Sequence, residues 1–236
     1  MTVRPVLLAL LLALAGLVGG VAALGVQALR PAGDVRQYLL AHPEVIPEAM
    51  QRLQDRETGK AVAANRAGIV EPFPGAVGGN PKGDVTVVAY MDYACGFCRA
   101  SLPEVARLVA ADPGVRVVYR ELPILSPASR TAAQWSLAAA EQGRFMAFHQ
   151  AMYGAGRPSD AAVAAAAAQA GLDLPRARGV IGSPAVLAEI GKNLQMAGAL
   201  GLTGTPSWVI GDRVLSGAIG YDAMVDAIKA ARDRAS

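Results

Sequence analysis

The chain has 236 residues, a net charge of +3 and two cysteines. It is long enough for one large domain together with additional segments. It has no run of Lys and Arg and no basic patch interleaved with aromatic residues, so we expect no nucleic acid partner. Both cysteines lie in one Cys-x-x-Cys motif, which leaves none for a separate structural bridge and fits a protein whose only disulfide is catalytic. We expect no bound cofactor.

Residues 1–30 are predicted to be a targeting segment. Arg4 supplies a short positive start, and no charged residue occurs from Pro5 to Leu29. A signal peptide has an apolar core of roughly 7–15 residues and a cleavage site of small residues, for which Val21 to Ala23 is suited. The uncharged run is longer than such a core, and about 20 apolar residues can cross a bilayer. A cleaved signal peptide and a membrane anchor both remain open, and either predicts a periplasmic location, where disulfides persist.

Residues 31–66 form a predicted helical segment. Ile46, Met50 and Leu53 fall on one helical face, and charged residues occupy the opposite face. A helix gains stability by burying such an apolar stripe, but the segment has too few apolar residues to build its own core. It is therefore either a solvated spacer or an oligomerisation arm.

Residues 67–83 are rich in Pro and Gly and are predicted to be a linker and domain entry. A domain boundary near residues 66–76 follows. The main domain is then expected to span residues 84–234.

The motif Cys95-Gly96-Phe97-Cys98 stands between a β-branched predicted strand and a helical pattern of apolar residues. A strand that feeds a Cys-x-x-Cys at the start of a helix is the redox motif of the thioredoxin fold. The helix N-terminus carries roughly half a positive charge, which favours the nucleophilic thiolate of Cys95. Cys98 lies one turn later, within reach of the same sulfur, and is expected to be more buried and to act as the resolving thiol. Gly96 and Phe97 are expected to tune the redox poise.

Three other uses of the two thiols compete with this reading. A structural disulfide across a two-residue loop would add little stability, because stabilisation grows with loop length. A zinc site needs about four ligands, whereas His42 and His149 lie far apart in the sequence, so we assign no metal ligands. Copper(I) is compatible with two soft thiolates, which makes a copper-binding or copper-tolerance protein the alternative function. A non-catalytic binding module is a third possible function, after the oxidoreductase and the copper protein.

The rest of the main domain mixes strands and helices. A second strand is predicted from Val115 to Leu122, parallel to the first because a helix connects the two. Residues 126–200 are predicted to be helical, with His149 packed near an aromatic cluster. Beyond Gly204-Thr205-Pro206, the pair Gly211-Asp212 predicts a type II′ hairpin loop, and a terminal helix follows. This order of strands and helices along the chain indicates an α/β fold.

Four features together resemble the DsbA family of thioredoxin-fold thiol–disulfide oxidoreductases over about residues 76–233. They are the run Asp92 to Cys98, the helical insertion, Gly204-Thr205-Pro206, and the final strand–strand–helix. The resemblance implies a thioredoxin fold with a helical insertion at about residues 126–200.

The same resemblance implies roles for individual residues. Cys95 would attack, Cys98 would resolve, and Thr205-Pro206 would form a cis peptide bond that faces the disulfide and binds substrate. The chain departs from the thioredoxin pattern at Ala89, where such proteins often carry a buried acid six residues before the first cysteine. The group that takes the proton of Cys98 is therefore unassigned.

The segment Tyr38 to Ile46 is similar to the N-terminal part of the ScsC-like subgroup. This similarity implies a homo-oligomer, with a trimer as the expected form. The sequence as a whole thus predicts an exported enzyme that forms or isomerises disulfides in cysteine-containing protein substrates. Such an enzyme also requires a membrane redox partner that resets its Cys-x-x-Cys.

Overall fold

A computed structural model describes residues 14, 16–17, 20 and 32–235 of the chain. The predicted targeting segment, residues 1–30, lies almost wholly outside this described part. Within the described part, no helix is long and apolar enough to cross a membrane.

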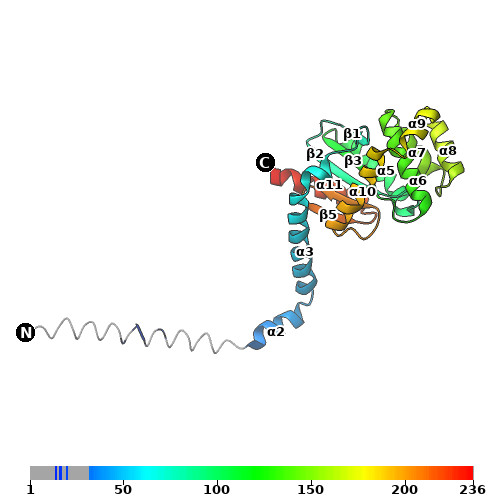
Figure 1. Ribbon diagram of the computed structural model, residues 1–236. Coiled ribbons are helices and arrows are strands. Elements are labelled where there is room, and N and C mark those ends of the chain that lie inside the picture. Colours follow the sequence, from blue (N-terminus) through cyan, green and yellow to red (C-terminus); the bar gives the residue numbers. More distant parts are fainter. Residues whose placement is uncertain (1–13, 15, 18–19, 21–31, 236) are drawn as a thin grey trace, which may run out of the picture. The chain divides into compact units, whose positions relative to one another are not determined.

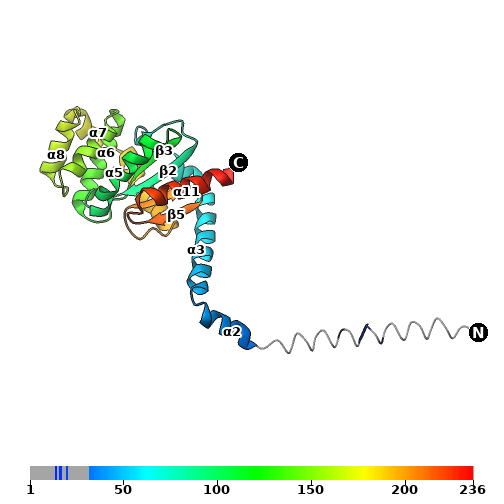
Figure 2. The same cartoon turned by 180° about the vertical axis from the view of Figure 1, so that it is seen from behind.

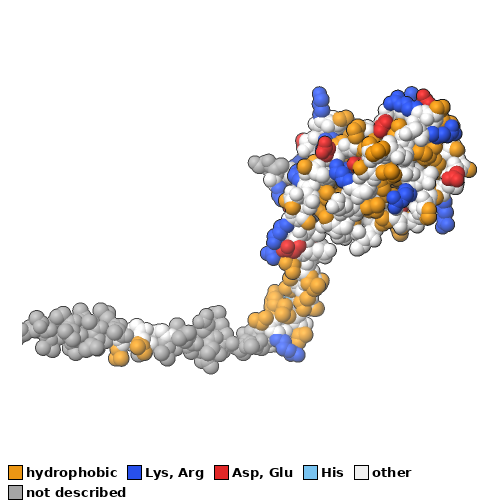
Figure 3. Space-filling view, in the orientation of Figure 1, with side chains coloured by type: hydrophobic (Ala, Val, Ile, Leu, Met, Phe, Trp, Pro, Cys, Tyr) orange, Lys and Arg blue, Asp and Glu red, His pale blue; other side chains and the backbone are white. Residues whose placement is uncertain are grey.

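The chain divides into two units, residues 1–53 and residues 54–236, and each is described by itself. This division falls inside helix α3. The first unit contains α2 (Ala32–Ala41) and the beginning of α3 (Val45–Ala64). Apolar side chains line this unit (Figure 3), and Ile46, Met50 and Leu53 are exposed.

The second unit contains the five strands and most of the helices (Figure 1). In chain order these elements are the end of α3, α4 (Arg66–Val70), β1 (Val77–Gly79), β2 (Val85–Met91), α5 (Gly96–Ala111), β3 (Val115–Glu121), α6 (Pro127–Glu141), α7 (Phe145–Gly154), α8 (Asp160–Gln169), α9 (Leu174–Val180), α10 (Pro184–Ala199), β4 (Ser207–Ile210), β5 (Arg213–Ser216) and α11 (Gly220–Ala235).

The strands form one sheet in the order β1-β3-β2-β4-β5. Strands β2 and β3 are parallel, as the intervening helix predicted, and the other pairs are antiparallel. The β4–β5 loop consists of Gly211 and Asp212, and Gly211 has a φ of 64°. A positive φ at the first loop position only is the signature of the predicted type II′ turn.

The side chains of alternate residues in β2 point to opposite faces of the sheet, as the two-residue period of a strand requires. Val87 and Ala89 pack in a core with apolar residues of α5 and α11. Val88 and Tyr90 pack in a second core with residues of α4, α10 and the end of α3. Figure 2 shows α11 across one face of the sheet, with helices α6 to α9 gathered beyond it at one end. This arrangement is the predicted thioredoxin fold with a helical insertion.

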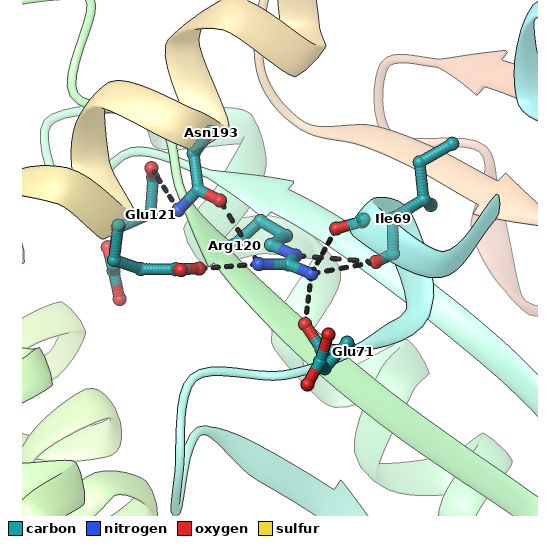
Figure 4. Close-up of polar contacts among 7 residues, drawn as sticks. Ile69, Glu71, Arg120, Glu121 and Asn193 are labelled. Atoms are coloured by element: carbon teal, nitrogen blue, oxygen red, sulfur yellow. Dashed lines mark hydrogen bonds and ion pairs between the residues drawn. The ribbon is translucent and has the colours of Figure 1, made fainter. Parts of the chain in front are cut away.

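The segment predicted to be a linker contains α4 and β1. Buried Arg120 of β3 holds α4 in place (Figure 4). Its guanidinium pairs with Glu189 of α10, donates to Asn193 Oδ1 at 3.3 Å, and donates to the carbonyl oxygens of Ile69 at 3.0 Å and of Glu71. Because the last carbonyls of a helix have no partner within it, this one arginine ties the end of α4 to both the sheet and α10.

Candidate active site

The two cysteines lie where β2 passes into α5. Cys95 is the N-cap of α5, and its sulfur accepts from the backbone N–H of Cys98 at 3.4 Å. The Cys95 thiol in turn donates to the carbonyl oxygen of Thr205 at 3.1 Å. Both thiols are free. The helix N-terminus therefore faces the Cys95 sulfur, as the sequence pattern predicted.

Cys98 is more deeply buried than Cys95, again as predicted. Its exposed fraction is 0%, against 6% for Cys95. Burial raises the pKa of the Cys98 thiol to about 12, although the backbone of Asp92 and the side chain of Thr205 act in the opposite direction. Removing this thiol's proton is therefore difficult without a nearby acceptor.

The peptide bond between Thr205 and Pro206 is cis, as the family resemblance implied. It stands directly before β4, which pairs with β2. The carbonyl oxygen of Thr205 accepts from the Cys95 thiol, and the Thr205 hydroxyl is buried. The loop before β4 thus forms one wall of the site.

The rim of the site is apolar and open to solvent. Gly96 is exposed, and the exposed fraction of the Phe97 side chain is 68%. Ile124 and Leu125, on the loop after β3, are also exposed. An open apolar rim suits a flexible polypeptide better than a small polar molecule.

Asp92 organises the loops around the motif, although the sequence analysis gave it no role of its own. One carboxylate oxygen accepts from the N–H of Ala94 at 2.7 Å. The other accepts from the N–H groups of Ile124 and Leu125, both at 2.9 Å. Asp92 is 1% exposed, so it holds the Cys-x-x-Cys loop and the apolar loop together from within.

A buried carboxyl, that of Glu121, lies beneath the motif. It accepts hydrogen bonds from the hydroxyls of Tyr93 at 3.1 Å and Ser136 at 2.8 Å. Burial raises the pKa of Glu121 to about 8, the charge of Asp92 acts in the same direction, and the two hydroxyls partly oppose the rise. Glu121 was not identified from the sequence.

His149 lies at 3.1 Å from the Tyr93 hydroxyl through Nδ1. Burial lowers the pKa of His149 to about 3, so its ring is neutral at pH 7. Its Nε2 has no partner, which fits a ring whose proton sits on Nδ1 and points to Tyr93. The rings of Tyr93, Tyr119, Phe145 and Tyr153 surround it, which confirms the predicted aromatic cluster.

Tyr153 packs beside Tyr93 and bonds to the loop that precedes the motif. Its ring centroid lies 4.8 Å from that of Tyr93, and its hydroxyl donates to the carbonyl oxygen of Asp92 at 3.0 Å. The pKa of Tyr153 is raised well above its usual value, first by burial, then by the neighbouring Cys98, and also by Tyr93 and Glu121.

Among the residues that the structure describes, no group of three or more His, Cys, Asp or Glu could hold a metal ion. A cavity of about 690 Å³ is lined by Arg66, Asp84 and Asp212, among others. It lies at the start of β2, whereas the cysteines follow the end of that strand.

Comparison with known proteins agrees with this geometry. The profile of the DSBA-like thioredoxin domain matches residues 86–229, which is more than half of the chain. The chain belongs to this family. The resemblance to the DsbA family, with its thioredoxin fold, is thereby confirmed.

Solved structures lead to the same family. A thioredoxin-like oxidoreductase from Silicibacter pomeroyi is 42% identical, with a TM-score of 0.69, over 72% of this chain and 98% of its own. A linker-deletion mutant of ScsC from Proteus mirabilis is 26% identical, with a TM-score of 0.69, over 89% of this DsbA-family chain and 94% of its own. The profile of the copper resistance protein ScsC N-terminal domain also matches residues 35–58, which confirms the predicted subgroup.

A curated relative is much longer than this chain. Na⁺/H⁺ antiporter NhaA 3 of Salinispora tropica is 30% identical over 167 residues, which make up 69% of this chain and 25% of the antiporter. The DsbA-family chain therefore spans about a quarter of the length of the curated relatives that it matches.

Proposed function

We propose that this chain is an exported protein thiol–disulfide oxidoreductase that forms or isomerises disulfides through Cys95 and Cys98. The position of the Cys95 sulfur carries the proposal. It caps a helix N-terminus, 3.4 Å from the N–H of Cys98, while Cys98 itself is shielded from solvent. A helix N-terminus stabilises a thiolate, so Cys95 is the sulfur suited to attack and to be attacked.

In this proposal both directions pass through a mixed disulfide on Cys95. In the oxidase direction, a substrate thiolate attacks the Cys95–Cys98 disulfide, and a second substrate thiolate then releases the reduced enzyme. In the isomerase direction, the Cys95 thiolate attacks an incorrect substrate disulfide. Thr205 and Pro206 contact the substrate beside the sulfur, and Gly96 and Phe97 set the redox poise. A membrane redox partner then restores the working state of the motif.

Two assays test the proposal. Refolding of a reduced, unfolded protein measures oxidase activity, and refolding of a scrambled-disulfide protein measures isomerase activity. We expect Cys95→Ser to abolish both, while Ser101→Ala, buried in the same helix, leaves both measurable. If the wild type is inactive in both assays but binds copper(I) through its two thiols, the copper-tolerance alternative replaces the proposal.

We further propose that the N-terminal unit makes the chain a homo-oligomer, with a trimer as the expected form. The exposed stripe of Ile46, Met50 and Leu53 supports this, because an amphipathic helix is stabilised by covering its apolar face. Closed symmetric assemblies are the usual outcome for such contacts. Several active sites in one assembly raise the effective concentration of each for a bound substrate, which favours isomerisation.

Light scattering on the chain without residues 1–30 tests whether the N-terminal arm makes the protein an oligomer. We expect Met50→Asp to produce monomers with reduced isomerase activity. Gln51→Asp, at an exposed position away from the stripe on the same helix, should leave the assembly intact. A wild-type monomer would make the arm a spacer. Monomers that keep full isomerase activity would show that assembly serves another purpose.

A further inference from the structure

The cavity of about 690 Å³ lies at the start of β2, at the other end of that strand from the cysteines. Its walls come from the last turn of α3, from α4, from β2 and β4, and from the end of α11. Sites for small molecules typically measure about 300–1,000 Å³, so the cavity is large enough to hold a ligand. The redox reaction proposed above makes no use of it.

The floor of the cavity is apolar. Val88 of β2 and Val209 of β4 are paired residues of neighbouring strands, and Val62 of α3 and Ile69 of α4 line the same space. All four belong to the second hydrophobic core, and each is at most 2% exposed. An apolar ligand in the cavity is therefore in contact with side chains of this core.

The rim of the cavity is charged, and two of its arginines are already paired. Arg232 is shared between two acids, with Asp84 at 2.7 Å and Asp112, outside the lining, also at 2.7 Å. Arg234 lies 2.6 Å from Asp212. These two arginines therefore have little charge to offer to a ligand.

Arg66 is the arginine of the lining that the protein itself leaves without a partner. It is exposed at the start of α4, and among the described residues 32–235 its side chain has neither an ion-pair nor a hydrogen-bond partner. A guanidinium binds a carboxylate through two parallel N–H bonds, which fix the orientation of the bound group. An open guanidinium beside an apolar floor fits a ligand with one anionic head and an apolar body.

We propose that this cavity binds a free monocarboxylate with an unbranched apolar chain, of the class of the medium-chain fatty acids. The carboxylate pairs with Arg66, and the chain covers Val88 and Val209. This site is independent of the proposed redox function, because the residues that line the cavity include neither cysteine nor the Thr205–Pro206 bond.

The acids of the rim select against other head groups. Asp84 stays charged, because its hydrogen bond with Arg232 lowers its pKa. A phosphate with two negative charges would need a second unpaired cation and would be repelled by Asp84 and Asp212, in the way that like charges reject a wrong partner. A neutral head leaves Arg66 unpaired, and a cationic head is repelled by it. A carboxylate is therefore the head group that this rim favours.

Isothermal titration calorimetry with decanoate at about pH 7.5 tests the proposal. The protein is the chain without residues 1–30, which keeps every residue of the two cores and of the cavity. Decanoate, kept below its micelle concentration, should bind saturably with one molecule per chain. Arg66→Gln should weaken this affinity at least about tenfold, because the bonds to a charged group are lost. Arg130→Gln, the same change at an exposed position of α6, should match the wild type.

Two further probes test the head group. 1-Decanol, with the same chain and no charge, should bind at least about tenfold more weakly than decanoate, and decyl phosphate should also bind more weakly. The inference is overturned if decanoate does not bind saturably, if wild type and Arg66→Gln have equal affinities, or if decyl phosphate binds as tightly as decanoate.

A last variant separates the cavity from the other exposed apolar surface of α3. Met50→Asp changes the stripe of the N-terminal arm, where Met50 is exposed, and leaves the lining of the cavity untouched. An unchanged affinity for decanoate in Met50→Asp supports the cavity as the site. Loss of binding in this variant would place the ligand on the arm and overturn the inference.

Discussion

Replacing Asp92 should loosen the two loops that it holds together at the active site. Its two carboxylate oxygens bind three backbone N–H groups at 2.7–2.9 Å, one in the Cys-x-x-Cys loop and two in the loop with Ile124 and Leu125. Asp92→Ala leaves all three donors without a partner. In Asp92→Asn, the single remaining oxygen can serve only one side, so either the Ala94 bond or both loop bonds are lost.

The expected size follows from these bonds. A hydrogen bond to a charged group contributes about 1.5–3 kcal/mol, and an unsatisfied buried donor costs about 1–3 kcal/mol. Asp92→Asn loses at least one charged bond and weakens the others, so we expect a loss of about 3 kcal/mol in the free energy of unfolding. Asp92→Ala, with three unpartnered donors, should lose about 5 kcal/mol.

Urea unfolding of the reduced protein measures these losses. The matched control is Asp173→Ala, which removes an exposed N-cap aspartate that accepts from one N–H, that of Arg176, at 3.0 Å. Loss of such a cap costs typically about 1 kcal/mol. The two loops should also become sensitive to proteases in Asp92→Ala and stay resistant in the control. If Asp92→Ala costs no more than Asp173→Ala, Asp92 does not hold the loops.

Three further predictions address the cysteines, the anchor of α4 and the dependence on pH. Cys98→Ser should accumulate a covalent complex with substrate through Cys95 on non-reducing gels, because the resolving thiol is missing; adducts in Cys95→Ser instead would reverse the roles. Arg120→Met leaves the buried carboxylate of Glu189 without its ion-pair partner, so the free energy of unfolding should fall by about 3–5 kcal/mol. Urea titrations measure this loss, and a loss below about 1 kcal/mol, the level of exposed ion pairs, would contradict the expectation. Burial raises the pKa of Glu121 from 4.5 to about 8. The contribution of Glu121 to the stability of the fold is therefore complete below about pH 4.5 and is lost as the pH rises through about 8. His149 behaves in the opposite way: burial lowers its pKa from 6.5 to about 3, so its contribution is complete above about pH 6.5 and is lost as the pH falls through about 3. Glu121→Gln should therefore gain a few kcal/mol relative to wild type between pH 5 and 9, and a constant difference between the two proteins would show that Glu121 does not titrate in this range.

Local patterns in the sequence were sufficient for the elements that bring the cysteines into place. A β-branched run before Cys95 and an apolar helical period after Cys98 predicted β2 and α5, and the connecting helix predicted the parallel β2–β3 pair. These signals succeed because each depends on residues close in the chain. The same holds for Gly211 and Asp212, where turn chemistry alone selects the hairpin.

The parts that the sequence did not reveal depend on contacts between distant residues. Strand β1 contains Gly78 and Gly79, a composition typical of a loop, and it is a strand because it pairs with β3. Such tertiary contacts override weak strand propensity. Glu121 likewise looks like an ordinary charged residue at a strand end; only the fold brings it to Tyr93, 28 positions away, and Ser136.

The helical insertion is part of the redox site rather than an addition to its outside. Helix α6 supplies Ser136, and α7 supplies His149 and Tyr153, all three buried beneath the motif. Ser136 donates directly to the carboxyl of Glu121 in the central sheet, and His149 is linked to that carboxyl through the Tyr93 hydroxyl. A buried polar group needs all its partners at once, since each partner left unsatisfied in a dry interior is costly. The sheet and the insertion therefore build this buried polar group jointly.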